Sequence, residues 1–173
     1  MITHTTTPTT RLLPRHLRPK TRRALLSLHV ISSVGLLGAS SALLFLAITA
    51  TTTGDPELAH SAYRFMSMFG FVFGIPLSFS ALISGVVLGL GSKWGVLRYP
   101  WVTIKLFLLV TTILGGALVI GRVSAQLADG TGGSEGQLLA AASYNVVALV
   151  TSTILSIYKP GRRRGPARRA RPA

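Results

Sequence analysis

The chain has 173 residues, a net charge of +14 and a mean hydropathy of +0.52, and only 13% of its residues are charged. Soluble domains carry about 25% charged residues, so this composition excludes an ordinary soluble fold and is typical of a polytopic membrane protein. The basic residues flank apolar segments and do not interleave with a soluble fold, which argues against a nucleic-acid-binding protein. The chain has no cysteine, which excludes disulfides, iron–sulfur clusters and thiolate zinc sites.

Four long apolar segments organise the chain between two basic tails. A membrane-spanning helix needs about 20 largely apolar residues, and a secretory signal has a much shorter apolar region, so we interpret the first segment as a retained helix. We therefore predict an all-α polytopic membrane protein, a four-helix transmembrane bundle over residues 24–158. The predicted parts are a largely disordered N-terminal tail at 1–23, spans at about 24–50, 65–90, 101–120 and 138–158, and a disordered C-terminal tail at 159–173.

The basic residues predict the orientation of the spans. Six precede the first span, two lie between the second and third spans, and seven follow the fourth, so fifteen of the eighteen lie on one side. All four acidic residues lie in the two other connections. The positive-inside rule then predicts a multi-pass protein of the inner (plasma) membrane with both termini cytoplasmic. We expect the tails to attract anionic lipid headgroups, at about 1 kcal/mol per basic residue.

Small and polar residues indicate how the helices pack. One face of the second span is built from small residues, and small residues let membrane helices approach closely: Gly74, Ser78, Ala81, Gly85 and Gly89. Pro76, in the middle of that span, is expected to bend it. The fourth span carries a polar stripe, which we expect to face other helices: Asn145, Ser152 and Ser156.

Two ionisable side chains lie within the spans at similar depth. Lys105 is expected roughly 6–10 Å inside the cytoplasmic interface and His29 about 9 Å inside it, from 1.5 Å of rise per residue. The face of Lys105 continues through Thr112 and Gly116, and the face of His29 continues through small residues, so both are expected to face other helices. The alternative for Lys105 is a side chain that snorkels to the interface, and for His29 a hydrogen-bonded packing residue.

A cationic pair without a carboxylate partner predicts an anionic or oxygen-bearing ligand. No span contains an acidic residue, so a porphyrin with its propionates, a lipid phosphate or a quinone oxygen would each satisfy His29 and Lys105. Neutral imidazole is also a common ligand of metals and haem iron. The other histidines lie in the tail and an outer loop, which disfavours a two-histidine haem within one chain: His4, His16 and His60. No motif of a known hydrolase, nucleotide-binding protein or metalloprotease is present, and whether the protein is an enzyme stays open.

Several stretches resemble a known group of proteins. LHVISSVGLLGASSAL and IPLSFSALISGVVLGLGSKWGVLRYPWVTIKL, within residues 24–125, resemble small uncharacterised four-span bacterial integral membrane proteins. More distantly, the first-span His and third-span Lys are similar to those of copper-resistance D-type proteins and HemJ-type protoporphyrinogen oxidases. That resemblance implies haem as the cofactor and functional roles for His29 and Lys105. The chain departs from those proteins at Leu36, where a tryptophan is usual, and at Tyr99, where a histidine is frequent.

Two functional hypotheses follow. In the first, the protein binds haem b or a porphyrin, with His29 as the axial iron ligand and Lys105 pairing a propionate or assisting proton transfer. In the second, it is a non-catalytic scaffold or accessory subunit that packs through Gly-rich helix faces, as a homo-oligomer or with a membrane partner subunit. A transporter ranks third, because four spans would need oligomerisation.

Overall fold

The computed structural model describes residues 18–91 and 100–158, and every element in these ranges is helical. The elements are α1 (Pro19–Thr52), α2 (Pro56–Phe69), η1 (Gly70–Gly74), α3 (Ile75–Leu90), α4 (Pro100–Leu114), η2 (Gly115–Ile120), α5 (Gly121–Ala128) and α6 (Glu135–Tyr158). They form four continuous helices that are long and apolar enough to cross a membrane: Pro19–Thr52, Pro56–Leu90, Pro100–Ala128 and Glu135–Tyr158. The predicted all-α, four-span architecture is therefore confirmed. The predictions for residues 1–17, Tyr99 and the C-terminal tail lie outside the described residues.

Each helix is longer than the apolar run that predicted it. The first begins at Pro19, so part of the predicted N-terminal tail is helical, and the second begins at Pro56, well before the predicted start. The reason is local, because proline at the first helical position has a suitable φ and lacks an N–H that would go unpaired there. In α2 the Asp55 carboxylate also accepts hydrogen bonds from the backbone N–H groups of Glu57 (2.9 Å) and Leu58 (3.4 Å).

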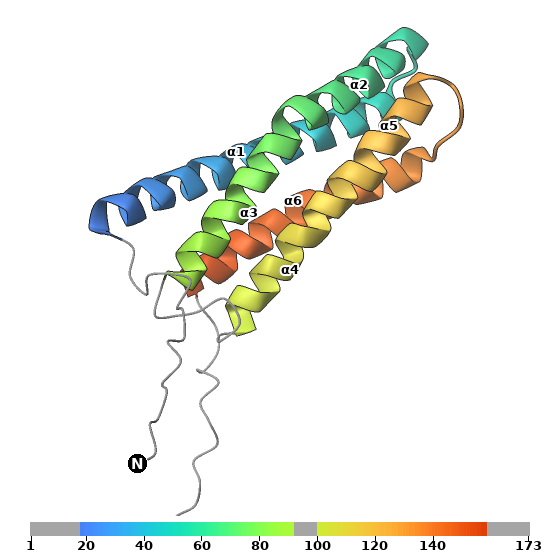
Figure 1. Cartoon of the computed structure of the whole chain (residues 1–173). Helices are drawn as coiled ribbons and strands as arrows, with labels where there is room; N and C mark the ends of the chain where they lie inside the picture. The colour runs from blue at the N-terminus through green and yellow to red at the C-terminus, as the bar shows by residue number, and fades with distance from the viewer. Residues whose placement is uncertain (1–17, 92–99, 159–173) are drawn as a thin grey trace, which may run out of the picture.

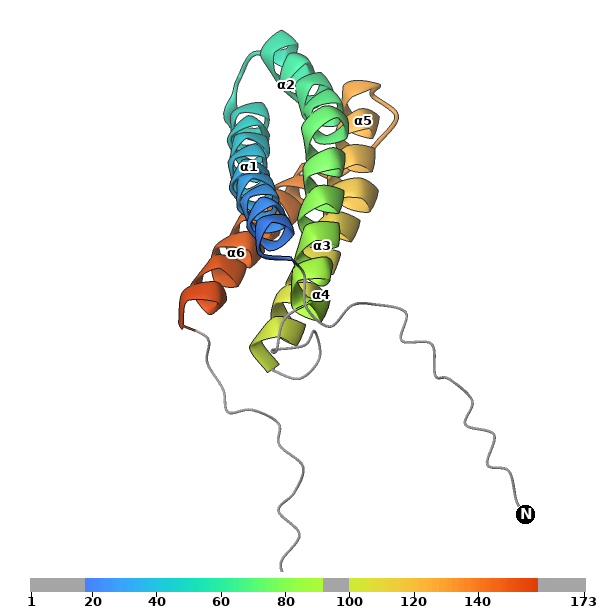
Figure 2. The same cartoon turned by 60° about the vertical axis from the view of Figure 1, so that its left-hand side comes forward.

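The four helices run antiparallel to their sequence neighbours, so the bundle has two distinct ends (Figure 1). We call the end with Pro19, Leu90, Pro100 and Tyr158 the tail end, and the end with the connections 53–55 and 129–134 the loop end. At the loop end α2 packs against both α1 and α5, whereas α3 and α4 make few contacts with each other. The helices accordingly spread apart toward the tail end, as Figure 2 shows for α6 and α4.

The loop end holds the apolar core of the bundle. We call this cluster the loop-end core: Leu43, Ala47, Ala50, Ala62, Tyr63, Met66, Ile120, Val123, Leu138 and Ala142. The phenolic O–H of Tyr63 donates a 2.9 Å hydrogen bond to the Glu135 carboxylate, which joins α2 to the start of α6. In the connection that follows α5, three glycines have positive φ, a conformation that other residues rarely adopt: Gly130, Gly132 and Gly133.

Two of the long helices contain a wide turn near their middle. The turn η1 ends two residues before Pro76, and the backbone bond that closes it runs from the N–H of Ile75 to the carbonyl of Gly70, five residues earlier. Proline in a helix removes one N–H and clashes with the carbonyl four residues earlier, so a wide turn relieves a strain that a regular helix would carry. The second wide turn, η2, contains no proline and begins with the pair Gly115 and Gly116.

Large apolar side chains cover the outside of the bundle. Phe71 is 72% exposed, Phe45 68% and Val147 63%. Apolar surface of this extent would promote aggregation in water but is suited to lipid hydrocarbon. The four helices and this outer surface together describe a multi-pass membrane protein.

We expect Met66→Ala to destabilise the bundle by about 2 kcal/mol, because a fully buried methionine leaves a cavity when it is truncated. Met68, two positions along the same helix, is 59% exposed, and Met68→Ala is expected to change stability little. Thermal unfolding of both variants in the same detergent measures the difference. Equal unfolding temperatures would contradict the placement of the loop-end core.

Candidate functional site

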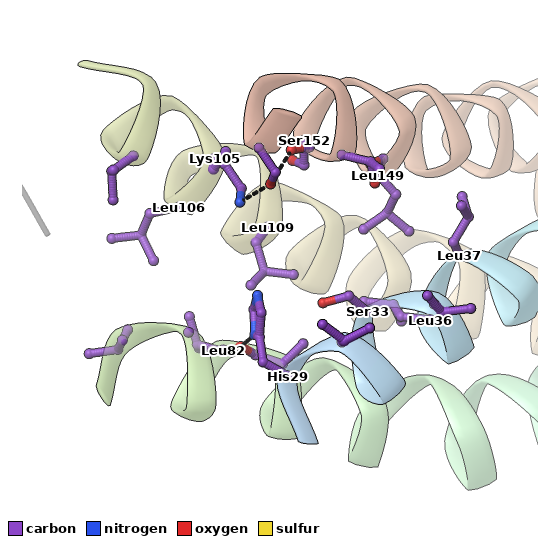
Figure 3. A pocket seen from close by; sticks show the side chains of 18 of the residues that line it. His29, Ser33, Leu36, Leu37, Leu82, Lys105, Leu106, Leu109, Leu149 and Ser152 are labelled. Carbon is purple, nitrogen blue, oxygen red and sulfur yellow. Dashed lines mark hydrogen bonds between the residues drawn. The ribbon is translucent and has the colours of Figure 1, made fainter. Parts of the chain in front are cut away.

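A cavity of about 360 Å³ lies between the four helices in the half of the bundle toward the tail end. Side chains of α1 and α3 line one wall and those of α4 and α6 the other (Figure 3). The lining is mainly apolar, with a few polar groups, which is the composition of small-ligand sites in proteins. Both predicted site residues, His29 and Lys105, line this one cavity.

His29 is held against α3 through one nitrogen of its ring. Its Nδ1 atom lies 3.1 Å from the carbonyl oxygen of Ala81 and 3.1 Å from Oγ of Ser84. A carbonyl only accepts hydrogen bonds, so Nδ1 carries the proton and donates it. The Ser84 hydroxyl donates to the Ser80 carbonyl at 2.5 Å, so its oxygen can accept from Nδ1 as well. This arrangement leaves Nε2 unprotonated in the neutral ring, with a lone pair for a hydrogen-bond donor or a metal.

Gly85 makes room for the imidazole ring. A Cβ at this position would lie 3.0 Å from Cε1 and 3.4 Å from Nδ1 of His29, closer than normal packing allows. The glycine that the sequence assigned to general helix packing therefore has a specific task, the close approach of α3 to His29. A hydrogen bond of 2.8 Å between Ser32 and Ser80 joins α1 and α3 next to this contact.

Lys105 extends from the opposite wall. Its ammonium group donates a hydrogen bond to the Ser156 hydroxyl of α6, which in turn donates to the Ser152 carbonyl at 3.0 Å (Figure 3). The lysine thus reaches toward a neighbouring helix, and it lines the same cavity as His29. An ammonium group has three donors, so the hydrogen bond to Ser156 leaves capacity for an oxygen-bearing ligand.

The contacts of these walls include residues that the sequence did not assign to the site. The sequence singled out Ser156 as packing polarity, and it is the partner of Lys105. Ser84 and the carbonyl of Ala81 were not foreseen as partners of His29, although serines four residues apart at positions 80 and 84 mark one polar face of α3. Leu36 lines the cavity and is 3% exposed.

In the described part of the chain, no group of three or more His, Cys, Asp or Glu side chains is placed to hold a metal ion. Among the described residues, the cavity therefore has no cluster of such side chains that could bind a metal ion together. Of the residues that line the cavity, His29 is the only histidine.

The comparisons with known proteins agree with the architecture. A family model described as "Predicted integral membrane protein (DUF2269)" matches residues 23–158, which include all the residues of this cavity. Neither the curated proteins nor the solved structures that were compared contain a match.

The contacts of His29 predict its tautomer. NMR of the protein with isotope-labelled histidine should show the Nδ1–H form for His29, with the signal assigned by its loss in His29→Gln. Ser84→Ala should keep this tautomer, because the Ala81 carbonyl remains, whereas Gly85→Ala should displace the ring and alter the signal. An Nε2–H form in the unaltered protein would contradict this geometry.

Proposed function

The chain belongs to the family of predicted integral membrane proteins (DUF2269), and we propose that its cavity binds haem b or a porphyrin through His29 and Lys105. The observation that carries the proposal is the arrangement of two groups in one apolar cavity. An imidazole with a fixed, protonated Nδ1 lies on one wall, and an ammonium group lies on the other. The resemblance drawn from the sequence alone, to copper-resistance D-type and HemJ-type proteins, would assign a role to the same pair of residues.

The orientation of His29 supports a role as axial ligand. Histidines that bind metals commonly donate their other ring N–H to a carbonyl or carboxylate, which fixes the ring and raises its basicity. The Ala81 carbonyl and Ser84 supply this hydrogen bond. Nε2 is then the ligand atom that would bind the iron.

The opposite wall supports a ligand with an acidic group. The ammonium of Lys105 would pair with a propionate, while the leucine side chains of the cavity would cover the apolar macrocycle. Val30 and Val34 line the cavity and are also 51% and 66% exposed, so the cavity reaches the surface of the bundle and a planar ligand need not be fully enclosed. When bound, haem supplies one-electron chemistry; the residues of this chain bind the group, orient it and hold a cation beside its carboxylate.

We further propose that the tail end faces the cytoplasm and that the membrane is the inner (plasma) membrane of a bacterium. All four acidic residues lie at the loop end and fifteen of the eighteen basic residues lie in segments at or beyond the tail end, which supports this orientation. With this orientation the basic termini would contact anionic headgroups, and the cavity would lie toward the cytoplasmic leaflet.

The absorption spectrum of the purified protein, expressed with haem precursor, tests the proposal. A Soret band is expected, and His29→Ala should lose it. Lys105→Met should bind haem about tenfold more weakly, because a charge-assisted hydrogen bond contributes about 1.5 kcal/mol. His60→Ala is the matched control, since His60 is exposed near the loop end and should leave the band unchanged.

Absence of a band in the unaltered protein supplied with haem would contradict the proposal. So would a band that survives in His29→Ala and disappears in His60→Ala.

A second candidate function is a non-catalytic scaffold that assembles through a glycine face. A Cβ at Gly70 or Gly74 would meet no atom within 4 Å, so this pair lies on an open surface of the bundle, where another membrane helix could approach. The scaffold hypothesis predicts that Gly70→Ile with Gly74→Ile reduces oligomers or loses a partner subunit, measured by cross-linking in the membrane. An unchanged cross-linking pattern would rule out this face.

A further inference from the structure

The charged end and the apolar end of the cavity lie at different depths (Figure 3). Lys105 lies five residues after the start of α4 and Ser156 two residues before the end of α6, so both lie within about 8 Å of the tail end. At roughly 14 Å and deeper the lining consists of leucines and one serine: Leu36, Leu37, Leu109, Leu149 and Ser33. From the tail end inward, the cavity therefore has the order of polar head and apolar chain that one leaflet of a bilayer has.

The charge of Lys105 has no carboxylate side chain to compensate it. All four acidic residues of the chain lie at the loop end: Asp55, Glu57, Asp129 and Glu135. Asp129 directly follows the long helix that carries Lys105, and the rise along that helix separates the two residues by roughly 36 Å. Attraction over such a distance is negligible, whereas a cation between membrane helices is costly unless it is paired. Ser156 is neutral, so an anion has to come from outside the chain.

One side of the cavity is open to lipid, between α1 and α6. Val30 and Val34 of α1 are 51% and 66% exposed, Thr153 of α6 is exposed as well, and all three line the cavity. Ser32 of α1 bonds to Ser80 of α3, and the two valines lie on the opposite side of α1. An apolar chain held in the cavity would touch lipid hydrocarbon along this side, so the chain can be longer than the cavity itself.

The charge and the volume of the cavity narrow the class of ligand. One ammonium group compensates one negative charge, which fits a carboxylate, and the N–H donors that Ser156 leaves unused can form charge-assisted hydrogen bonds to it. The volume of about 360 Å³ is at the lower end of ligand-binding cavities, which favours an amphiphile with one chain over a phospholipid with two.

We propose that the cavity binds a fatty acid, with its carboxylate at Lys105 and its chain directed along the leucines toward the middle of the membrane. This ligand does not use Nε2 of His29, so the proposal goes beyond the binding of haem and stands without it. The two occupants would exclude each other, because both place a carboxylate at the same ammonium group.

Native mass spectrometry of the unaltered protein, expressed without haem precursor and purified in a neutral detergent, tests the role of the charge. Titration with hexadecanoic acid should give one bound molecule per chain. Hexadecanol has the same chain and no charge, and it should bind at least about tenfold more weakly, because it forms no charge-assisted hydrogen bond. Equal affinities for the acid and the alcohol would overturn the proposal.

Variants of Lys105 locate the charge that matters. Lys105→Gln should weaken the binding of hexadecanoic acid at least about tenfold and leave that of hexadecanol unchanged, whereas Lys105→Arg should retain the preference for the acid. Lys20→Gln is the matched control, since Lys20 is an exposed lysine near the start of α1. Helical circular dichroism and a single elution peak are required of every variant. Undiminished binding in Lys105→Gln, or the same loss in Lys20→Gln, would contradict a site at Lys105.

Photolabelling of the unaltered protein locates the chain of the ligand. Hexadecanoic acid with a diazirine in the middle of its chain should label Leu109 or Leu149, and an excess of unlabelled acid should suppress this reaction. Phe45 and Phe71 are 68% and 72% exposed on the outer surface and report contact from the surrounding detergent. Label confined to such outer positions would overturn the proposal. Because none of these measurements uses haem, a failure here is distinct from a failure of the proposed cofactor.

Discussion

Lipid hydrocarbon offers no hydrogen-bond partner, and this constraint determines where the polar side chains of the bundle lie. Most hydroxyls on the outer faces bond back to their own helix. Ser41, for example, donates to the Leu37 carbonyl at 2.9 Å, and Thr49 donates to the Phe45 carbonyl at 3.0 Å. An imidazole, an ammonium group or an amide is not satisfied in this way by a carbonyl of its own helix. They must be brought together between helices, and the cavity and the α4–α6 interface are where this happens.

The packing of the bundle differs between its two ends, and this difference makes room for a site. At the loop end small side chains such as Ala47 and Ala142, both fully buried, let the helices approach closely around Met66. Toward the tail end the helices diverge and the cavity takes the place of a core. Side chains that border a cavity have fewer van der Waals contacts, so the tail-end half of the bundle gains less packing energy than the loop end. The well-packed loop end supplies the rigidity against which the divergent ends are held.

The amino-acid pattern predicts the architecture far better than it predicts the contacts of the site. Apolar runs specify four helices because a bilayer demands length and continuity, and the small residues beside His29 and Lys105 indicate that both face other helices. The partner of each side chain depends on the register between helices, which no periodicity within one helix contains. The Ala81 carbonyl could not be foreseen, since a backbone acceptor is the same at every residue. The role of Gly85 and the wide turn at Gly115 likewise follow from three-dimensional contacts and not from spacing.

The exposed position of Val30 and Val34 on the wall of the cavity has a consequence for how an occupant would arrive. A sparingly soluble molecule partitions into the leaflet and diffuses laterally, so it can enter between the helices without passing through the aqueous phase. Occupancy would then follow its mole fraction among the lipids of that leaflet and not its concentration in bulk solvent. Loading would then take place from the leaflet that surrounds the tail-end half of the bundle.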